Sequence, residues 1–185
     1  MADRSGGRAV IGVILAGGRS SRMGEDKALL RIDGRTLLER THAILLEAGM
    51  ERVVISGEAH GGIADRWPMK GPIGGIASVA GELADGELLV VPVDMPRLDA
   101  VTLAPLRDER RMRATRWAGH PLPMRLTLDT TSRATLAELI GLEGRECSVS
   151  ALQARIGVAT LSLDRVDSQA LANCNTPDDW REANA

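Results

Sequence analysis

Hydrophobic and polar positions divide the chain into short apolar runs that alternate with amphipathic segments. The first run, Val10–Leu15, is uncharged, rich in β-branched residues and too short for a packed helix, so it predicts a strand buried on both faces. Similar runs at 53–55 and 88–91 predict a second and a third strand, with helical spacing at 37–48 and 76–83 between them. This alternation predicts an α/β fold: a doubly wound, mostly parallel sheet with helices on both faces.

Capping signals mark the ends of two helices. Thr36 and Glu39 form a capping box at the start of the first helix, and Gly49 is a stop signal at its end. Thr176 followed by Pro177 begins the last helix. The elements expected between them in the second half are a helix at 101–111, strands at 113–117 and 122–128, of which one could be antiparallel, helices at 134–140 and 149–156, and a strand at 158–163. No repeat or linker interrupts this order, so we expect one domain spanning 1–185.

A glycine-rich, cationic segment at 15–30 follows the first strand directly. In open α/β sheets ligands bind at the carboxyl ends of the strands. Gly17 and Gly18 let the backbone approach a ligand closely and turn its N–H groups toward an anion. Arg22 and Lys27 add full positive charges suited to phosphate oxygens. The segment predicts a polyphosphate-binding loop, against the alternative of a solvated surface turn.

The spacing of this loop excludes two common nucleotide-binding motifs. Gly24 is followed by Glu25, and Lys27 by Ala28, so the Gly-Lys-Ser/Thr ending of a Walker A loop is missing. The G-x-G-x-x-G dinucleotide fingerprint is also missing. Arg19 is a third candidate cation in the same loop.

Residues 15–30 read LAGGRSSRMGEDKALL, which resembles the signature of nucleotidyltransferases that attach a nucleotide to the molybdenum cofactor. The Gly-Gly and Asp-Lys pairs are similar to those of the molybdenum cofactor guanylyltransferases. Segments 71–76, 91–98, 120–122 and 173–179 match in the same order. The resemblance implies a three-layer, Rossmann-like fold of the nucleotide-diphospho-sugar transferase type. It also implies that GMP passes from GTP to the terminal phosphate of molybdopterin, with pyrophosphate as the leaving group and Mg²⁺, or Mn²⁺, as the metal.

Such a reaction requires positioning and charge neutralisation, because the acceptor is already a phosphate and no protein nucleophile is needed. We expect Lys27 and Arg22 to act on the triphosphate and Asp94 to hold the metal ion. The nucleotide-binding positions that the resemblance implies are Leu15, Ala16, Gly17, Gly18, Lys27, Ser56, Asp65, Gly74 and Asn175.

Asp94 directly follows the third apolar run and therefore lies at the same sheet edge as the loop. Mg²⁺ is usually held by one or two carboxylates together with phosphate oxygens and water, so a single strand-end Asp is enough. A turn or helix N-cap role for Asp94 is the alternative.

The resemblance places base recognition at Ser56 and Asp65. The family commonly has Asn where Ser56 stands, which is a departure. A carboxylate at Asp65 can accept hydrogen bonds from N1–H and N2–H₂ of guanine. Residues 71–76 resemble the loop that passes over the nucleotide.

Three polar residues have weaker signals. Asn173 and Asn175 precede the last helix and could orient a second, phosphate-bearing substrate, or they could simply form a turn. His120 could reach the pterin or be structural.

Composition restricts the partners. A net charge of −2 argues against binding of nucleic acid or of an anionic membrane surface, and no apolar run reaches the ~20 residues of a membrane span. Cys147 and Cys174 are widely separated, so we expect reduced thiols in a cytoplasmic protein. The expected partners are GTP and molybdopterin, with transient contact to proteins that deliver molybdopterin or to molybdoenzymes. The alternatives are a cytidylyl- or sugar-phosphate nucleotidyltransferase and a non-catalytic nucleotide-binding module.

Overall fold

A six-stranded mixed sheet forms the centre of the computed structural model, which describes residues 9–17, 26–164 and 166–183. Its strand order is β4-β1-β5-β7-β6-β8. All neighbouring pairs are parallel except those made by β7, which runs antiparallel to both β5 and β6. The strands are β1 (Val10–Leu15), β4 (Arg52–Ser56), β5 (Gly86–Pro92), β6 (Ala114–Trp117), β7 (His120–Leu128) and β8 (Val158–Leu161).

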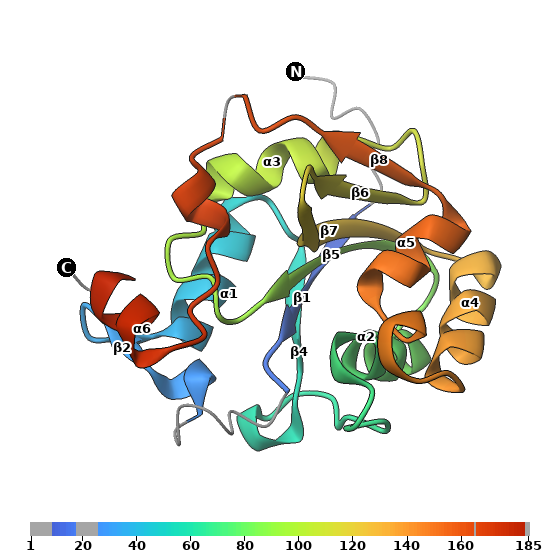
Figure 1. The fold of residues 1–185 in the computed structure, drawn as a ribbon, viewed down its shortest axis with the longest axis horizontal. Coiled ribbons are helices and arrows are strands. Elements are labelled where there is room, and N and C mark those ends of the chain that lie inside the picture. Colours follow the sequence, from blue (N-terminus) through green and yellow to red (C-terminus); the bar gives the residue numbers. More distant parts are fainter. Residues whose placement is uncertain (1–8, 18–25, 165, 184–185) are drawn as a thin grey trace.

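Helices cover both faces of the sheet, as Figure 1 shows. One face carries α1 (Leu37–Glu47) and α3 (Ala100–Asp108). The other face carries α2 (Gly71–Glu82), α4 (Thr130–Ile140) and α5 (Val149–Ile156). The last helix, α6 (Pro177–Ala183), lies beside α1 and a two-stranded hairpin of β2 (Arg31–Ile32) and β3 (Arg35–Thr36). The short 3₁₀ turns are η1 (Lys27–Leu29), η2 (Glu58–His60), η3 (Gly144–Glu146) and η4 (Ser168–Leu171).

The central strands are apolar throughout because each is buried on two sides. In β5, Leu88 and Val90 belong to the core beneath α2, α4 and α5, whereas Leu89 and Val91 belong to the core beneath α1 and α3. All four side chains are buried. Strands covered by helices on both faces lose the polar alternation of a half-exposed strand.

Helix α1 packs closely on β1 through a glycine. A Cβ atom at Gly12 would lie 3.1 Å from Cδ1 of Leu45, so a larger residue would push the helix away from the sheet. The predicted capping box is present, with Glu39 N donating to Thr36 Oγ1 and Thr36 N donating to a Glu39 carboxylate oxygen. These contacts fix the first crossover between β1 and β4.

Several details differ from the sequence prediction. Segment 71–76 is the first part of α2 and not a loop: Pro72 fits the first turn of a helix, where no N–H donor is needed, and Gly71 before it takes a φ of 54°. Helix α3 ends at Asp108, three residues before the predicted end, and β8 ends at Leu161, two residues before it. Helix α4 begins at Thr130 and β7 at His120, four and two residues before their predicted starts. The β2–β3 hairpin was not expected.

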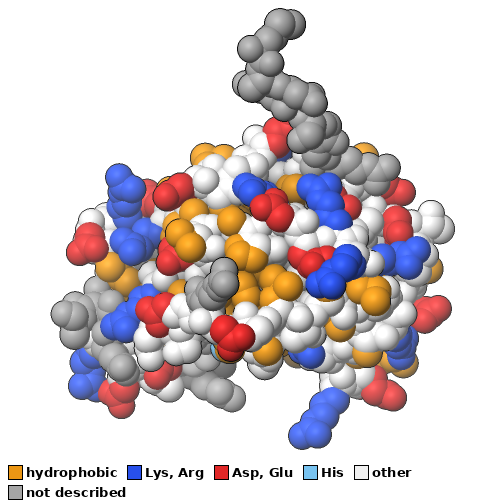
Figure 2. Space-filling model, turned by 90° about the horizontal axis from the view of Figure 1, so that it is seen from above, with side chains coloured by type: hydrophobic (Ala, Val, Ile, Leu, Met, Phe, Trp, Pro, Cys, Tyr) orange, Lys and Arg blue, Asp and Glu red, His pale blue; other side chains and the backbone are white. Residues whose placement is uncertain are grey.

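The described part of the chain contains no helix that is both long and apolar enough to cross a lipid bilayer. On the face seen from above in Figure 2, cationic and anionic side chains are interspersed among apolar ones.

Candidate active site

The carboxyl ends of β1 and β5 form a cleft at the point where the chain reverses its direction across the sheet. The connection from β1 leads to β4 on one side, and the connection from β4 returns to β5 on the other side of β1. Ligands bind at such switch points in open α/β sheets. The residues that line the cleft are Leu15, Ala16, Gly17, Asp26, Lys27, Gly71, Pro72, Pro92, Val93, Asp94 and Leu122.

Lys27 lies at the centre of a polar cluster in this cleft. Its Nζ donates to Asp94 Oδ2 at 3.2 Å and to Asn175 Oδ1 at 2.7 Å. The side chains of Lys27 and Asp94 are 18% and 19% exposed, so the pair is accessible from the cleft yet partly shielded from water. The structure thus brings together three predicted site residues from η1, from the loop after β5 and from the segment before α6.

The segment that carries Asn175 is fixed by its own main chain. Cys174 N donates to the carbonyl oxygen of Asp94 at 2.7 Å, which ties the segment to the end of β5. Asp179 Oδ2 accepts from the backbone N–H groups of Asn175 and Thr176, each at 2.8 Å. These backbone hydrogen bonds, more than any other interaction, lower the pKa of Asp179 below its usual value. The Asp179 carboxylate therefore stays ionised and holds the backbone of Asn175 in place.

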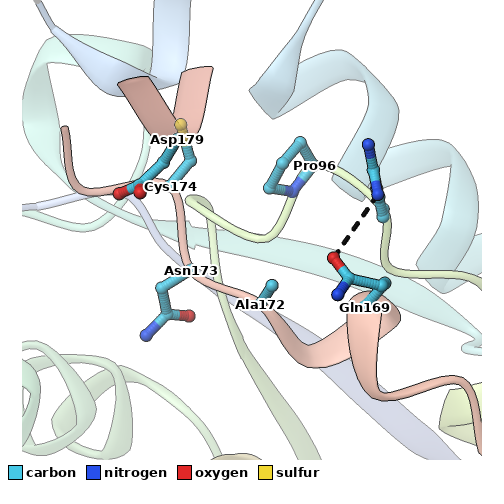
Figure 3. Close-up of a pocket in the computed structure, with 7 residues that line it drawn as sticks. Pro96, Gln169, Ala172, Asn173, Cys174 and Asp179 are labelled. Atoms are coloured by element: carbon cyan, nitrogen blue, oxygen red, sulfur yellow. Dashed lines mark hydrogen bonds between the residues drawn. The ribbon is translucent and has the colours of Figure 1, made fainter. Parts of the chain in front are cut away.

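A second hollow lies next to the segment before α6, with Cys174 and Asp179 in its lining, which Figure 3 shows. Cys174 and Asp179 lie side by side there, and Asn173 points away from them. Burial raises the pKa of the Cys174 thiol, and the carboxylates of Asp179 and Asp94 add to this against the opposing effect of Lys27. Cys174 is therefore a protonated thiol at neutral pH.

Ser56, Asp65 and Gly74 lie around the start of α2, but none of the three lines the cleft. Asp65 Oδ1 accepts from Trp67 N at 2.9 Å and from Ser78 Oγ at 3.2 Å, while Oδ2 lies 3.9 Å from the position of a Cβ on Gly17. The Ser56 side chain is buried, and its Oγ has no hydrogen-bond partner among the described residues.

Gly74 allows the backbone of α2 to approach this group. A Cβ there would lie 2.2 Å from the carbonyl oxygen of Trp67 and 3.3 Å from Asp65 Oδ1. The glycine is required by close backbone packing.

The remaining predicted residues are placed as follows. Gly18, Arg22 and Arg19 lie outside the described residues. His120 begins β7 at the same sheet edge, since β7 is antiparallel to β5, but it does not line the cleft. Sequence reasoning missed Asp26, although an Asp two residues before a turn N–H is an N-cap signal.

The oxygen atoms around Lys27 have the chemistry of a hard-cation site. Among the described residues, no group of three or more His, Cys, Asp or Glu side chains is placed to bind a metal ion. However, Asp94 Oδ2 and Asn175 Oδ1 both point at one ammonium group, so two oxygen ligands already converge around a single positive charge. Carboxylate and amide oxygens are suitable ligands for Mg²⁺ when substrate phosphates and water complete its shell.

Comparison with known proteins supplies independent evidence. Residues 12–156 match the MobA-like NTP transferase domain. The chain is 44% identical over 172 residues to the molybdenum cofactor guanylyltransferase of Xanthomonas euvesicatoria pv. vesicatoria, covering 91% of each chain. It is 29% identical over 180 residues to the molybdenum cofactor guanylyltransferase of Pseudomonas syringae pv. tomato, covering 89% of this chain and 88% of that protein.

Solved structures share the fold. The molybdopterin-guanine dinucleotide biosynthesis protein A of Archaeoglobus fulgidus superposes with a TM-score of 0.73 at 22% identity, covering 94% of this chain and 96% of that one. The 2-C-methyl-D-erythritol 4-phosphate cytidylyltransferase of Thermus thermophilus superposes with a TM-score of 0.67 at 18% identity, covering 93% and 96%. The predicted three-layer α/β fold is thereby confirmed.

Proposed function

Because the chain belongs to the MobA-like NTP transferase family and is therefore a nucleotidyltransferase, we propose that it transfers GMP from GTP to the terminal phosphate of molybdopterin. The products are the guanine dinucleotide form of the cofactor and pyrophosphate. The observation that carries this proposal is the convergence of Lys27, Asp94 and Asn175 in a cleft at the switch point of the sheet.

In the proposed reaction, a terminal phosphate oxygen of molybdopterin attacks the α-phosphorus of GTP. A new P–O bond forms as the bond to the β-phosphate oxygen breaks, and its electron pair leaves with pyrophosphate. Lys27 and Arg22 neutralise charge on the triphosphate, and the N–H groups of residues 16–18 orient it. Negative charge spreads over phosphate oxygens in the transition state, so preorganised cations and donors lower the barrier.

Asp94, assisted by the amide oxygen of Asn175, is the proposed holder of Mg²⁺, with Mn²⁺ as a substitute. When bound, the metal ion supplies charge neutralisation at the phosphate oxygens. Asp94 would hold the ion from a backbone that is tied to β1 by the hydrogen bond from Val93 N to Leu15 O at 3.2 Å.

Guanine is the proposed base because of the Asp65 carboxylate beside Gly17 and Gly74. A carboxylate accepts from N1–H and N2–H₂ of guanine together, whereas cytosine presents no such pair of donors. Ser56, whose hydroxyl has no hydrogen-bond partner among the described residues, adds one further polar group beside α2.

The proposal extends to the surroundings of the protein. The two free thiols, Cys147 and Cys174, fit a reducing compartment such as the cytoplasm. The proposed site residues all lie around one six-stranded sheet, which fits a single catalytic domain. Transient contacts with proteins that deliver molybdopterin or receive the product complete the proposal.

Pyrophosphate release from purified protein tests the function. With Mg²⁺, GTP and molybdopterin we expect stoichiometric pyrophosphate, and we expect CTP and UTP to compete poorly with GTP in a binding titration. Preferred use of CTP, or turnover with a sugar phosphate in place of molybdopterin, would support a related transferase instead. GTP binding without pyrophosphate release would support a non-catalytic module.

A further inference from the structure

His60 makes a shielded contact with the end of the glycine-rich segment. It belongs to η2, in the loop that follows β4, and its side chain is only 6% exposed. His60 Nε2 lies 3.0 Å from Asp26 Oδ2. His60 itself does not line the cleft, whereas Asp26 and its neighbour Lys27 do.

The Asp26 carboxylate has a second use. Its Oδ1 accepts from Ala28 N at 3.0 Å, and its carbonyl oxygen accepts from Leu29 N at 3.0 Å. Asp26 is thus the N-cap of η1, the turn whose first residue is Lys27. One carboxylate joins His60 to the backbone that presents the Lys27 ammonium to Asp94 and Asn175.

The loop that carries His60 is firmly attached to the sheet. Ile63 N donates to Ile55 O at 2.8 Å, and Gly57 N donates to Ile63 O at 2.9 Å. A Cβ at Gly62 would lie 2.3 Å from Ile55 O, so this backbone passes directly over the end of β4. His60 therefore projects from a fixed support.

The same loop touches the beginning of the glycine-rich segment. A Cβ at Gly57 would lie 3.4 Å from Gly17 N and 3.5 Å from the carbonyl carbon of Ala16. Residues 57–63 consequently contact the segment at both described ends, through Gly57 at residues 16–17 and through His60 at Asp26.

We propose that His60 is a positioning residue that holds Lys27 in register with the triphosphate through Asp26. This inference rests on the proposed function for its catalytic consequence, but the contact itself does not. Neither the imidazole nor its partner takes part in bond making. Their effect is to reduce the conformational entropy of η1, so that the Lys27 ammonium is already oriented toward the phosphate oxygens when GTP binds.

Kinetics of His60→Leu and His60→Gln test the catalytic consequence. Removing the donor in His60→Leu should lower kcat/KM for GTP about tenfold, because misplacing a positioning group typically costs up to ~10²-fold. His60→Gln keeps an N–H donor near the Nε2 position and should recover most of the loss. His42→Leu is the matched control, since His42 lies on α1, away from the cleft, and should leave kcat/KM unchanged.

A double-mutant cycle separates positioning from general destabilisation. If His60 acts through Asp26, then His60→Leu combined with Asp26→Ala should cost no more than Asp26→Ala alone, because groups in one network do not add. Additive losses, or a His60→Gln variant as poor as His60→Leu, would overturn the proposal.

Amide hydrogen exchange at Ala28 provides a readout that needs no activity. Its N–H is bonded to Asp26 Oδ1, so exchange should become faster in His60→Leu and Asp26→Ala and remain as in the parent in His42→Leu. Unchanged exchange in His60→Leu would refute the contact. A parent protein that releases no pyrophosphate would refute the proposed function alone, and exchange would still decide the inference. If His60→Leu fails to fold, His60→Ala takes its place as the variant without the donor, in the same comparison with His60→Gln and His42→Leu.

Discussion

Lys27 joins segments that are far apart in the chain: its ammonium group contacts Asn175, which is 148 positions away, and Asp94, which is 67 positions away. Both partners are polar groups on short connections whose backbones are tied together by the bond from Cys174 N to Asp94 O. The arrangement holds a positive charge against two oxygen atoms in a partly shielded cleft, where electrostatic interactions are stronger than in open water. A bound triphosphate would compete for the same ammonium.

Replacing either charged member of this cluster should strongly lower turnover and leave the fold intact. Lys27→Met and Asp94→Asn should each lower kcat by about 10²–10³-fold, which is typical for the loss of one preorganised charge in an active site. Steady-state pyrophosphate release measures the effect. Lys70→Met is the matched control, because Lys70 is similarly buried but binds Leu142 O and Glu143 outside the cleft, and it should stay within a few-fold of the parent. Parent-like activity in Lys27→Met or Asp94→Asn would contradict their roles.

Single residues differ in how far the sequence could reveal them. The meeting of Lys27 and Asp94 at one sheet edge was predictable, because each occupies a strand-end segment with a recognisable pattern. The contact between His60 and Asp26 was not, because a histidine in a short polar loop gives no periodic signal and its partner is set by tertiary packing. The lack of a hydrogen-bond partner for the Ser56 hydroxyl could not be predicted either, because it results from how closely α2 packs against β4.

Helix α2 shows how the start of an element can escape detection: the sequence predicted a helix over 76–83, whereas α2 begins at Gly71. Its residues from Ile73 to Ala80 are all buried, so no polar stripe marks where the helix begins. Gly71 and Pro72 resemble a turn in sequence, yet they are the first two residues of the helix. In contrast, the capping box at Thr36 and the uniform apolar run of β1 predicted their elements correctly, because both signals are local.

The β2–β3 hairpin is a local signal that was overlooked. Asp33 and Gly34 both have positive φ, 50° and 79°, as a type I′ turn requires, and Asp-Gly is a preferred pair for it. Each strand has only two residues, too few to show an alternating pattern.

Two glycines of α2 should respond in opposite ways to the same change. Gly74→Ala places a Cβ 2.2 Å from the backbone carbonyl oxygen of Trp67, so the helix or its support must shift, at a cost of roughly 1–3 kcal/mol of unfolding free energy. Gly81→Ala places it 3.5 Å from the flexible end of Arg66 and should stabilise the helix by about 0.5–1 kcal/mol. Urea denaturation of both variants measures the difference. Equal effects of the two substitutions would show that the close approach at Gly74 does not constrain α2.

Across the whole molecule, the sheet separates the cleft from a buried ion pair at its other end. Arg125 on β7 is fully buried and donates to Glu87 at 2.6 Å and to Thr127 Oγ1 at 2.8 Å. Glu87 is near the start of β5, whereas Pro92 ends that strand at the cleft, and five residues of strand span roughly 17 Å. The sequence predicted the alternation of elements but not this pair, since a charged residue within a strand normally indicates a solvent-facing position.

This separation predicts that stability and activity can be changed independently. Arg125→Met leaves the Glu87 carboxylate buried without its partner, so it should lower the unfolding free energy by about 3–5 kcal/mol. Adding Glu87→Leu removes the unpaired buried carboxylate. The double variant should recover most of the lost unfolding free energy, because an apolar pair of similar volume fits the interior. Thermal unfolding followed by circular dichroism measures both changes. At temperatures where each variant is folded, pyrophosphate release should remain within about twofold of the parent, since distant sites contribute independently. A folded Arg125→Met variant with strongly reduced turnover would show instead that the ion pair helps to hold the carboxyl edge of β5, and with it Asp94, in its working position.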